Sequence, residues 1–435
     1  MIYVRAIHFA ATLLAAGVAL FLVFVAEPAF RDGTSEARLP AILRPQLIGI
    51  AWIGLALAAI SGAAWLVLTA AEMSGEPLAA MLSDGTFWTV LSRTTFGNDW
   101  LARFVLACLL AAALAPFRSE RKTNSPLLKA VLAIVAAAFA GTLAWAGHAA
   151  GGIGLAALIH PAADVLHLIA AAAWVGALLP LLLMFAAAAG DRPSFAIARI
   201  ATLHFSTLGI VSVGTLLATG AVNTWYLAGS IPALVGTDYG RLLLAKIALF
   251  LIMVAIAALN RLQLTPRIVQ ETDQTSAQAA LRQLRRNATT ETLLGAIVIA
   301  IVAVLGTLPP GSHAAHHHEQ SGPVPAGAAF VHIHSEQGMI EVTIMPGRTG
   351  IARAIIHLWN DDYEALEAKA VTLTLTPPVA GSPSTTRVAS PGPDEAWQVD
   401  RIRLAQPGNW TVAVDALLSS GKRLVLDAPI VIDAN

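Results

Sequence analysis

Charged side chains are scarce in this sequence of 435 residues, and their scarcity decides its class. Asp, Glu, Lys and Arg together make up 12% of the chain, while apolar residues make up 56%. An average soluble domain carries about 25% charged residues. The formal net charge is zero, which argues against the basic surface that nucleic-acid binding needs. We therefore expect a protein of the lipid bilayer with no nucleic-acid partner.

Two further absences narrow the chemistry. Cys108 is the only cysteine, so no internal disulfide can form, and we expect its side chain to be a small buried apolar group. The phosphate-binding pattern G-x-x-x-x-G-K-[ST] does not occur. Any transport would therefore run downhill or be coupled to an ion gradient. Separately, we do not expect an enzyme.

Long apolar runs fill residues 1–310, and they predict an all-α polytopic membrane bundle. No internal repeat stands out among them. The segment 77–92 is apolar but broken by Asp84 and Gly85, which indicates a short interfacial helix in place of a ninth span. The eight predicted spans are 4–25, 47–71, 100–116, 127–147, 163–186, 201–226, 241–259 and 292–308.

Basic residues are distributed unevenly between the connections of these spans. They concentrate after the first, third, fifth and seventh spans and are few on the other side. Because positive loops stay in the cytoplasm, both chain ends are expected on the extracytoplasmic side. The first span is too long for a usual signal-peptide core, so we expect it to be retained as a helix.

The character of the chain changes after the last span. Residues 1–309 form the predicted membrane domain, and residues 310–326 are a linker rich in His, Pro and Gly. Short alternating apolar runs separated by turn residues follow at 327–435. They predict an extracytoplasmic all-β sandwich.

Histidines and one carboxylate cluster at the expected extracytoplasmic edge of the bundle. Asp164 and His167 share a helical face, His148 ends the fourth span, and His8 lies one turn inside the first. Imidazole suits copper, zinc, iron and nickel, and a carboxylate can orient or join such ligands. We therefore predict a metal site of His8, His148, Asp164 and His167. His160 is a weaker candidate, expected as a helix cap or loop residue.

Other polar groups in the spans favour simpler interpretations. His204 lies near the opposite end, as an interfacial group or the second end of a pathway. Asn223 and Lys246 are costly in lipid unless they are paired, and we expect Lys246 to extend toward the interface. Asp99 and Arg103, one turn apart, predict an ion pair.

The β-domain offers a second candidate metal site. His332 and His334 lie two apart on a predicted strand and so on one face of it. Met339 and Met345 follow, and thioethers select Cu(I). The alternative is two ordinary surface histidines. The linker stretch "SHAAHHHE", Ser312–Glu319, could bind metal or simply be solvated.

Taken in order, several motifs resemble the CopD family of bacterial copper-resistance membrane proteins. They are "RAIHFAATLLAAG", "TTFGNDWLAR", "GHAA", "ADVLHLIAAAAWVGAL", "HFSTLG", "TGAVNTWY" and "ETLLGAIVIAIVAVLGTLPP". The likeness covers residues 1 to about 310. The domain after it is similar to the small YtkA-like or FixH-like β-domain of some fused proteins, through "VHIH" and "GNWTVAVDAL".

The resemblance implies copper handling at the bacterial inner membrane, usually import from the periplasm. It implies His8, His148, Asp164 and His167 as metal ligands, with Trp174 and Gly176 as packing positions. The chain has no CopC-like domain ahead of the spans, so a copper chaperone would be a separate protein. Two alternatives stay open: a haem protein with axial histidines, and an assembly factor that delivers copper to an oxidase.

Overall fold

The computed structural model shows two compact units, a helical bundle and a β-domain. Eight helices in its described part are long and apolar enough to cross a membrane, and they confirm the predicted number of spans. The residues that the structure describes are 1–33, 39–74, 78–83, 85–118, 125–146, 156–188, 192–228, 230–270, 274–308, 325, 327–335, 338–360, 365–378 and 383–434.

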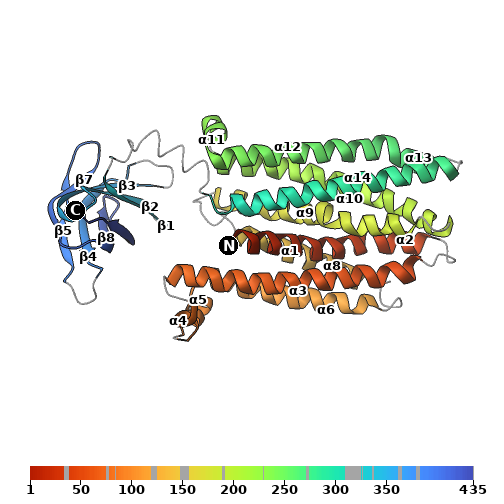
Figure 1. Cartoon of the computed structure of the whole chain (residues 1–435), viewed down its shortest axis with the longest axis horizontal. Helices are drawn as coiled ribbons and strands as arrows, with labels where there is room; N and C mark the ends of the chain where they lie inside the picture. The colour runs from red at the N-terminus through yellow and green to blue at the C-terminus, as the bar shows by residue number, and fades with distance from the viewer. Residues whose placement is uncertain are drawn as a thin grey trace. The chain divides into compact units, whose positions relative to one another are not determined.

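All spans but the fourth are longer than the predicted apolar runs, because residues at their ends continue the helices. Figure 1 shows these long helices side by side. The first span joins α1 (Ile2–Phe21), a π-helical turn (Leu22–Ala26) and α2 (Glu27–Asp32). The seventh joins α12 (Asp238–Leu259), a second π-helical turn (Asn260–Leu264) and α13 (Thr265–Gln270). The third joins α6 (Thr95–Leu114) and a 3-10 turn (Ala115–Arg118), and the fourth joins α8 (Pro126–Gly141) and a 3-10 turn (Thr142–Ala146). The others are α3 (Leu39–Ser74), α9 (Ala156–Ala187), α10 (Arg192–Ala228) and α14 (Gln274–Leu305).

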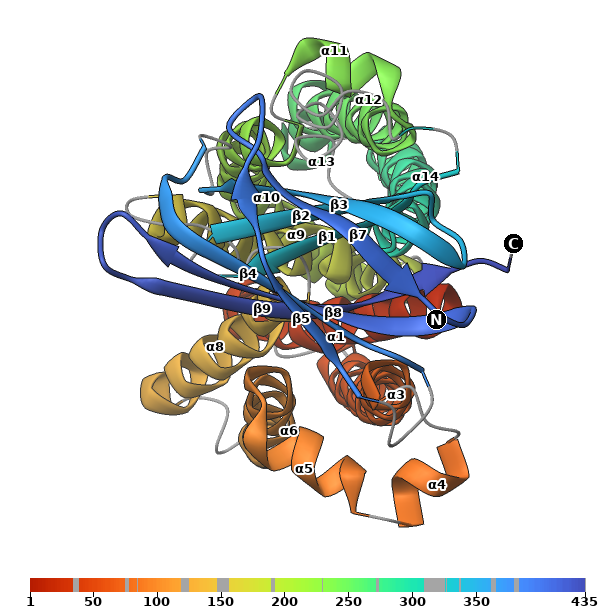
Figure 2. The ribbon, with the colours of Figure 1, turned by 90° about the vertical axis from the view of Figure 1, so that its left-hand side faces the viewer.

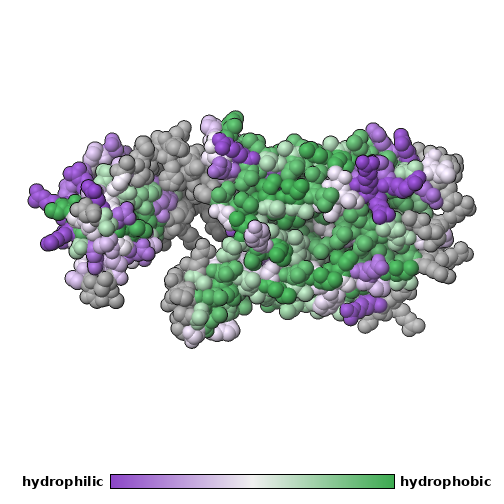
Figure 3. Space-filling view, viewed as in Figure 1, coloured by the Kyte–Doolittle hydropathy of each residue, from purple (hydrophilic) through white to green (hydrophobic). Residues whose placement is uncertain are grey.

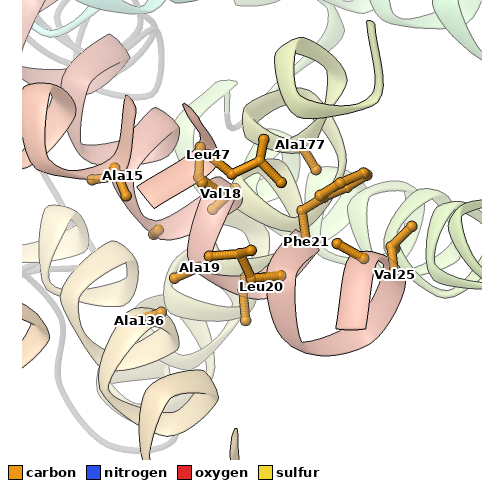
Figure 4. Packing of buried hydrophobic residues seen from close by; sticks show 14 of the residues in the cluster. Ala15, Val18, Ala19, Leu20, Phe21, Val25, Leu47, Ala136 and Ala177 are labelled. Atoms are coloured by element: carbon orange, nitrogen blue, oxygen red, sulfur yellow. The ribbon is translucent and has the colours of Figure 1, made fainter. Parts of the chain in front are cut away.

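Helix α1 is the most buried of the spans and separates two groups of helices. The end-on view in Figure 2 shows α3, α6 and α8 on one side of it, and α10, α12 and α14 on the other. Small side chains let its neighbours approach, as Figure 4 shows. There, residues of α1 lie beside Leu47 of α3, Ala136 of α8 and Ala177 of α9.

The two ends of the bundle differ in their polar groups. Arg5 near the start of α1 donates to the carbonyl oxygen of Gly306 just after α14, at 2.6 Å; we call this end the terminal end. At the opposite, far end, hydrophilic residues gather over α13, beyond the green band of apolar side chains in Figure 3. Arg44 of that end lies inside α3, where it is buried and donates to Glu27 of α2 at 2.8 Å.

Local details correct three expectations. The segment 77–92 forms two short helices, α4 (Leu78–Ser83) and α5 (Thr86–Arg93), which Gly85 separates in a left-handed conformation. Cys108 is exposed on α6 and not buried, because this helix has lipid-facing positions where a small apolar group costs nothing. Helix α9 begins before His160, so this residue is buried inside a helix and is neither a cap nor a loop residue.

The β-domain is a sandwich of two antiparallel sheets, as the alternating runs predict. One sheet has the order β1 (Ala329–Ser335), β2 (Gly338–Met345), β3 (Gly350–Trp359), β7 (Trp397–Leu404) and β6 (Ser390–Pro391). The other has the order β5 (Thr385–Val388), β4 (Ala368–Thr376), β8 (Gly408–Leu418) and β9 (Arg423–Ile432). Alternate residues of both sheets, such as Val342 and Val414, form one buried core.

Candidate functional site

A cluster of polar side chains lies between α9 and α10 near the terminal end. Asp164 and His167 are three positions apart on α9 and face α10, as their spacing predicts. Asn223 of α10 donates from Nδ2 to Oδ1 of Asp164 at 3.2 Å. His167 Nδ1 lies 3.0 Å from the hydroxyl of Thr219 on the same helix.

The Thr219 hydroxyl determines which nitrogen of His167 carries the proton. This hydroxyl has one hydrogen, and it donates that hydrogen to the carbonyl oxygen of Thr215 at 2.6 Å. It can therefore only accept from His167, so Nδ1 is the protonated nitrogen. The lone pair of Nε2 is left as the ligand position, which is how metal-binding imidazoles are commonly oriented.

His167 and Asp164 line a cavity of about 680 Å³ enclosed by α1, α9, α10, α12 and α14. Most of its wall is apolar, and its polar residues include Arg5, Tyr239 and Lys246. Lys246 was expected to extend to the interface. It instead lines this outer cavity, which Asp164 also lines.

The outer cavity offers few but varied cation ligands. Asn223 Oδ1 is buried and lacks a hydrogen-bond partner among the described residues. With His167 Nε2 and the Asp164 carboxylate it makes one nitrogen and two kinds of oxygen donor. In the described ranges, no three His, Cys, Asp or Glu side chains gather closely enough to hold a metal ion.

His8 belongs to a different polar group, between α1, α3 and α6. Its Nδ1 lies 3.0 Å from the carbonyl oxygen of Ala58 and 3.2 Å from the Ser61 hydroxyl. A carbonyl can only accept, so Nδ1 is protonated here too, and Nε2 accepts from the Arg103 guanidinium at 2.6 Å. The ring is 2% exposed and packs against Trp65 and Trp100. Both nitrogens of His8 are therefore already engaged.

The remaining membrane candidates are placed as follows. Arg103 donates to Thr142 and His8. Its charge and that of Asp99 interact, as their spacing predicts, but within the described residues no direct contact joins the two side chains. His160 stacks on Tyr226 with ring centroids 5.3 Å apart. His148 and the linker stretch Ser312–Glu319 lie outside the described residues.

A second cavity, of about 380 Å³, lies toward the far end between α9, α10, α12 and α14. Sequence analysis missed its polar residue Glu291, which is 2% exposed and accepts from Asn260 Nδ2 at 2.8 Å. Trp174 and Leu217 line both this inner cavity and the outer one. Trp174 is 1% exposed and meets Phe250 edge to face. An acidic residue beside an apolar span, here Glu291, is the sequence signal that could have indicated this polar site.

In the β-domain, His332 lies beside a buried carboxylate. Its Nδ1 is 3.3 Å from Oε1 of Glu341, which is 2% exposed, and Trp359 donates to Oε2 of the same carboxylate at 3.3 Å. His357 stands opposite Glu341 on the next strand. His334 pairs with Met339 in the strand register, and Met339 is buried; the His334 side chain lies outside the described part.

Comparison with known proteins shows which family the membrane part resembles. A family model described as copper resistance protein D matches residues 198–305, and one described as copper resistance protein D-like, N-terminal domain, matches residues 1–158. Copper resistance protein D of Pseudomonas syringae pv. tomato is 33% identical over 314 residues, 68% of this chain and 91% of its own length. The chain belongs to the copper resistance protein D family.

Two other relatives extend the comparison. Inner membrane protein YebZ of Escherichia coli K12 is 34% identical over 312 residues, 71% of this chain and 98% of its own length. Copper transport protein CutJ of Bacillus subtilis 168 is 25% identical over 429 residues, 95% of this chain and 71% of its own length, so that alignment includes the β-domain. Family membership supports a multi-pass inner-membrane protein that handles copper, and the names of the relatives point to resistance and transport more than to catalysis. They give haem no support.

Proposed function

We propose that this protein carries copper ions across the bacterial inner membrane, from the periplasm to the cytoplasm, through the half of the bundle formed by α9, α10, α12 and α14. The observation that carries this proposal is the orientation of His167. Its Nε2 lone pair is left for a ligand at the outer cavity, beside the Asp164 carboxylate and the unpartnered Asn223 oxygen.

The ligand set favours transit over storage. The site offers one imidazole, one carboxylate and one amide oxygen. These three ligands bind a cation less tightly than a closed site of four ligands does. His148, the predicted further ligand, would complete the site from the connection before α9. Conduction needs binding strong enough for entry and weak enough for release.

The inner cavity continues the path toward the far end. It shares Trp174 and Leu217 with the outer cavity and contains the buried Glu291 carboxylate. A cation released at the level of Trp174 would meet that carboxylate next. The terminal end then faces the periplasm, as the basic loops predict, and a separate chaperone of the CopC type would supply copper there. The β-domain, through His332 and His334, would collect copper on the same side.

The test measures copper bound by the purified chain and copper accumulated by cells that express it. His167→Ala and Asp164→Asn are expected to lose bound copper and most of the added accumulation, because they remove the two strongest ligands. His204→Ala is the matched control, since this histidine of α10 lines neither cavity.

Four outcomes would contradict parts of the proposal. Normal binding and accumulation in His167→Ala would exclude the site. Loss of bound copper without any change in accumulation would favour delivery to another protein over transport. Loss of copper in a folded His8→Ala variant would show that His8 is a copper ligand after all. Unchanged copper affinity in a chain with both His332→Ala and His334→Ala would show that these two histidines do not bind copper.

A further inference from the structure

The two groups of helices carry matching residues, although no repeat stands out in the sequence. In α1, His8 precedes Gly17 by nine positions; in α9, His167 precedes Gly176 by nine positions. The match continues in the following spans, where Ser61-Gly62 of α3 corresponds to "TG" of α10 at residues 219–220. The expectation of no repeat is thus corrected: only a few positions in each span match, too few to be noticed without their contacts.

The contacts of these residues match as well. The Ser61 hydroxyl donates to the carbonyl oxygen of Leu57 at 2.6 Å, and the Thr219 hydroxyl donates to that of Thr215 at 2.6 Å. Each hydroxyl also lies against Nδ1 of the histidine in its own half. A β-carbon on the glycine that follows would meet Cε1 of that same histidine in both halves, at 3.0 Å and 3.7 Å.

The third spans of the two halves begin in the same way. Thr94 caps α6 by accepting from the backbone of Gly97 at 3.0 Å, and Thr237 caps α12 by accepting from Gly240 at 3.0 Å. A short helix precedes each cap, α5 in one half and α11 (Ile231–Gly236) in the other. Six positions after the glycine, each helix carries a basic residue, Arg103 in α6 and Lys246 in α12.

The fourth spans end alike, and the first spans meet reciprocally. "GTL" occurs at 141–143 and at 306–308, and the hydroxyls of Thr142 and Thr307 each donate to the carbonyl three residues earlier, at 2.8 and 2.7 Å. At the crossing of α1 and α9, Gly17 abuts the backbone of Ala172 while Gly176 abuts that of Leu13, each four positions before the other glycine. Reciprocal contacts of this kind are those of a two-fold axis.

We infer that the bundle is a duplicated unit of four spans with two equivalent histidine sites, and that the Arg103 guanidinium fills one of them in place of a cation. Both histidines are protonated on Nδ1 by the same hydrogen-bond argument, so both direct the Nε2 lone pair to the equivalent position. At His8 that lone pair accepts from Arg103 at 2.6 Å. At His167 the corresponding residue is Lys246, and within the described residues no hydrogen bond joins the two.

The exchange of arginine for lysine explains why one site is closed. Guanidinium is charged at all physiological pH values and forms directional bonds with its planar fork, whereas an ammonium group is a point charge on a flexible stem. Arg103 is buried and is also bonded to Thr142. Arg5 of the first half also stands where the second half has Asp164, so the closed site lacks the carboxylate of the open one. At the histidine of the second half lies the outer cavity of about 680 Å³.

The experiment counts copper ions bound per chain, relative to the wild type, in the purified full-length protein. The inference rests on the proposed function, because it takes His167 of the second half as a copper ligand. Lys246→Arg is expected to lose the copper that depends on His167, because its guanidinium takes the position of the ion. Lys246→Gln, the control, is expected to keep that copper, because it removes the positive charge of the lysine and adds no guanidinium group. Unchanged copper in Lys246→Arg would overturn the equivalence of the two sites.

The reciprocal variant opens the closed site. Arg5→Asp combined with Arg103→Lys gives the first half the carboxylate and the lysine that stand at the corresponding positions of the second half. It is expected to bind one additional copper ion, which a further His8→Ala change removes. A folded double variant with no additional copper would overturn the inference; if this variant does not fold, Lys246→Arg decides. Failure of the proposed function is a separate result, copper binding that His167→Ala leaves intact.

Discussion

The orientation of single side chains determines which histidines can bind a metal. His8 and His167 occupy similar places in the sequence pattern, and both were predicted as ligands from the apolar runs around them. Their difference comes from Arg103 and Lys246, which are far from them in the chain. Sequence spacing placed Asp164 and His167 on one face, whereas the partners of Nε2 required the tertiary structure.

His357 of the β-domain predicts a pH dependence of stability. Burial holds the pKa of His357 below its usual 6.5, although Glu341 and Asp394 act to raise it. The unfolded chain therefore binds more protons, so stability is fully present above about pH 6.5 and is lost as the pH falls below that value. Hydrogen exchange in β2 and β3 of the full chain, corrected for intrinsic rates, should therefore become faster as the pH falls below about 6.5.

The matched control for that measurement is His357→Gln, which is uncharged at every pH. It should weaken the dependence, and an equally steep dependence in this variant would assign it to other groups of the β-domain.

At the scale of the helices, the crossing of α1 and α9 depends on glycine. A β-carbon on Gly176 would lie closer to the carbonyl oxygen of Leu13 than any real contact allows, so Gly176→Ala should destabilise the bundle by about 1–3 kcal/mol. Gly214→Ala of α10 is the control, because a β-carbon there meets nothing within 4 Å. Thermal unfolding in detergent compares them, and equal midpoints would show that the crossing can separate without cost.

Element type was predictable, and helix ends were not. Apolar runs gave all eight spans, and alternation gave the sandwich, because burial in lipid or in a sheet imposes those patterns. The last span was predicted from 292, but α14 begins at Gln274, since a polar helix beyond the membrane leaves no apolar run. His160 was misplaced because the proline after it was taken to mark the first turn of α9, whereas the helix had already begun.

At the scale of the whole molecule, the proposed route runs through the two cavities, and Trp174, which lines both, would be its barrier. Gly220→Cys places a cysteine in the outer cavity and Gly214→Cys one in the inner cavity, and the β-carbon at either position meets nothing closer than 3.7 Å. With Cys108 replaced by serine, an impermeant thiol reagent should label each from one side only, and from opposite sides, in intact cells and inverted vesicles. Labelling of Gly220→Cys in intact cells also fixes the terminal end in the periplasm.

Removal of the barrier should change that pattern. Trp174→Ala is expected to expose both cysteines to both sides, whereas Trp65→Ala, a buried tryptophan that lines neither cavity, should not. If Trp174→Ala leaves labelling one-sided, the cavities are separate and the route lies elsewhere.

The π-helical turns at Leu22–Ala26 and Asn260–Leu264 bear on how the family evolves. A π-helical turn closes its hydrogen bond over one residue more than an α-helical turn, so each shifts the phase of the helix that follows. The predicted spans ended at 25 and 259, where these shifts occur. Each turn is equivalent to the insertion of one residue into an ancestral α-helix. One-residue gaps among relatives should therefore collect at these two turns, where a helix gains or loses length without disturbing the spans before it.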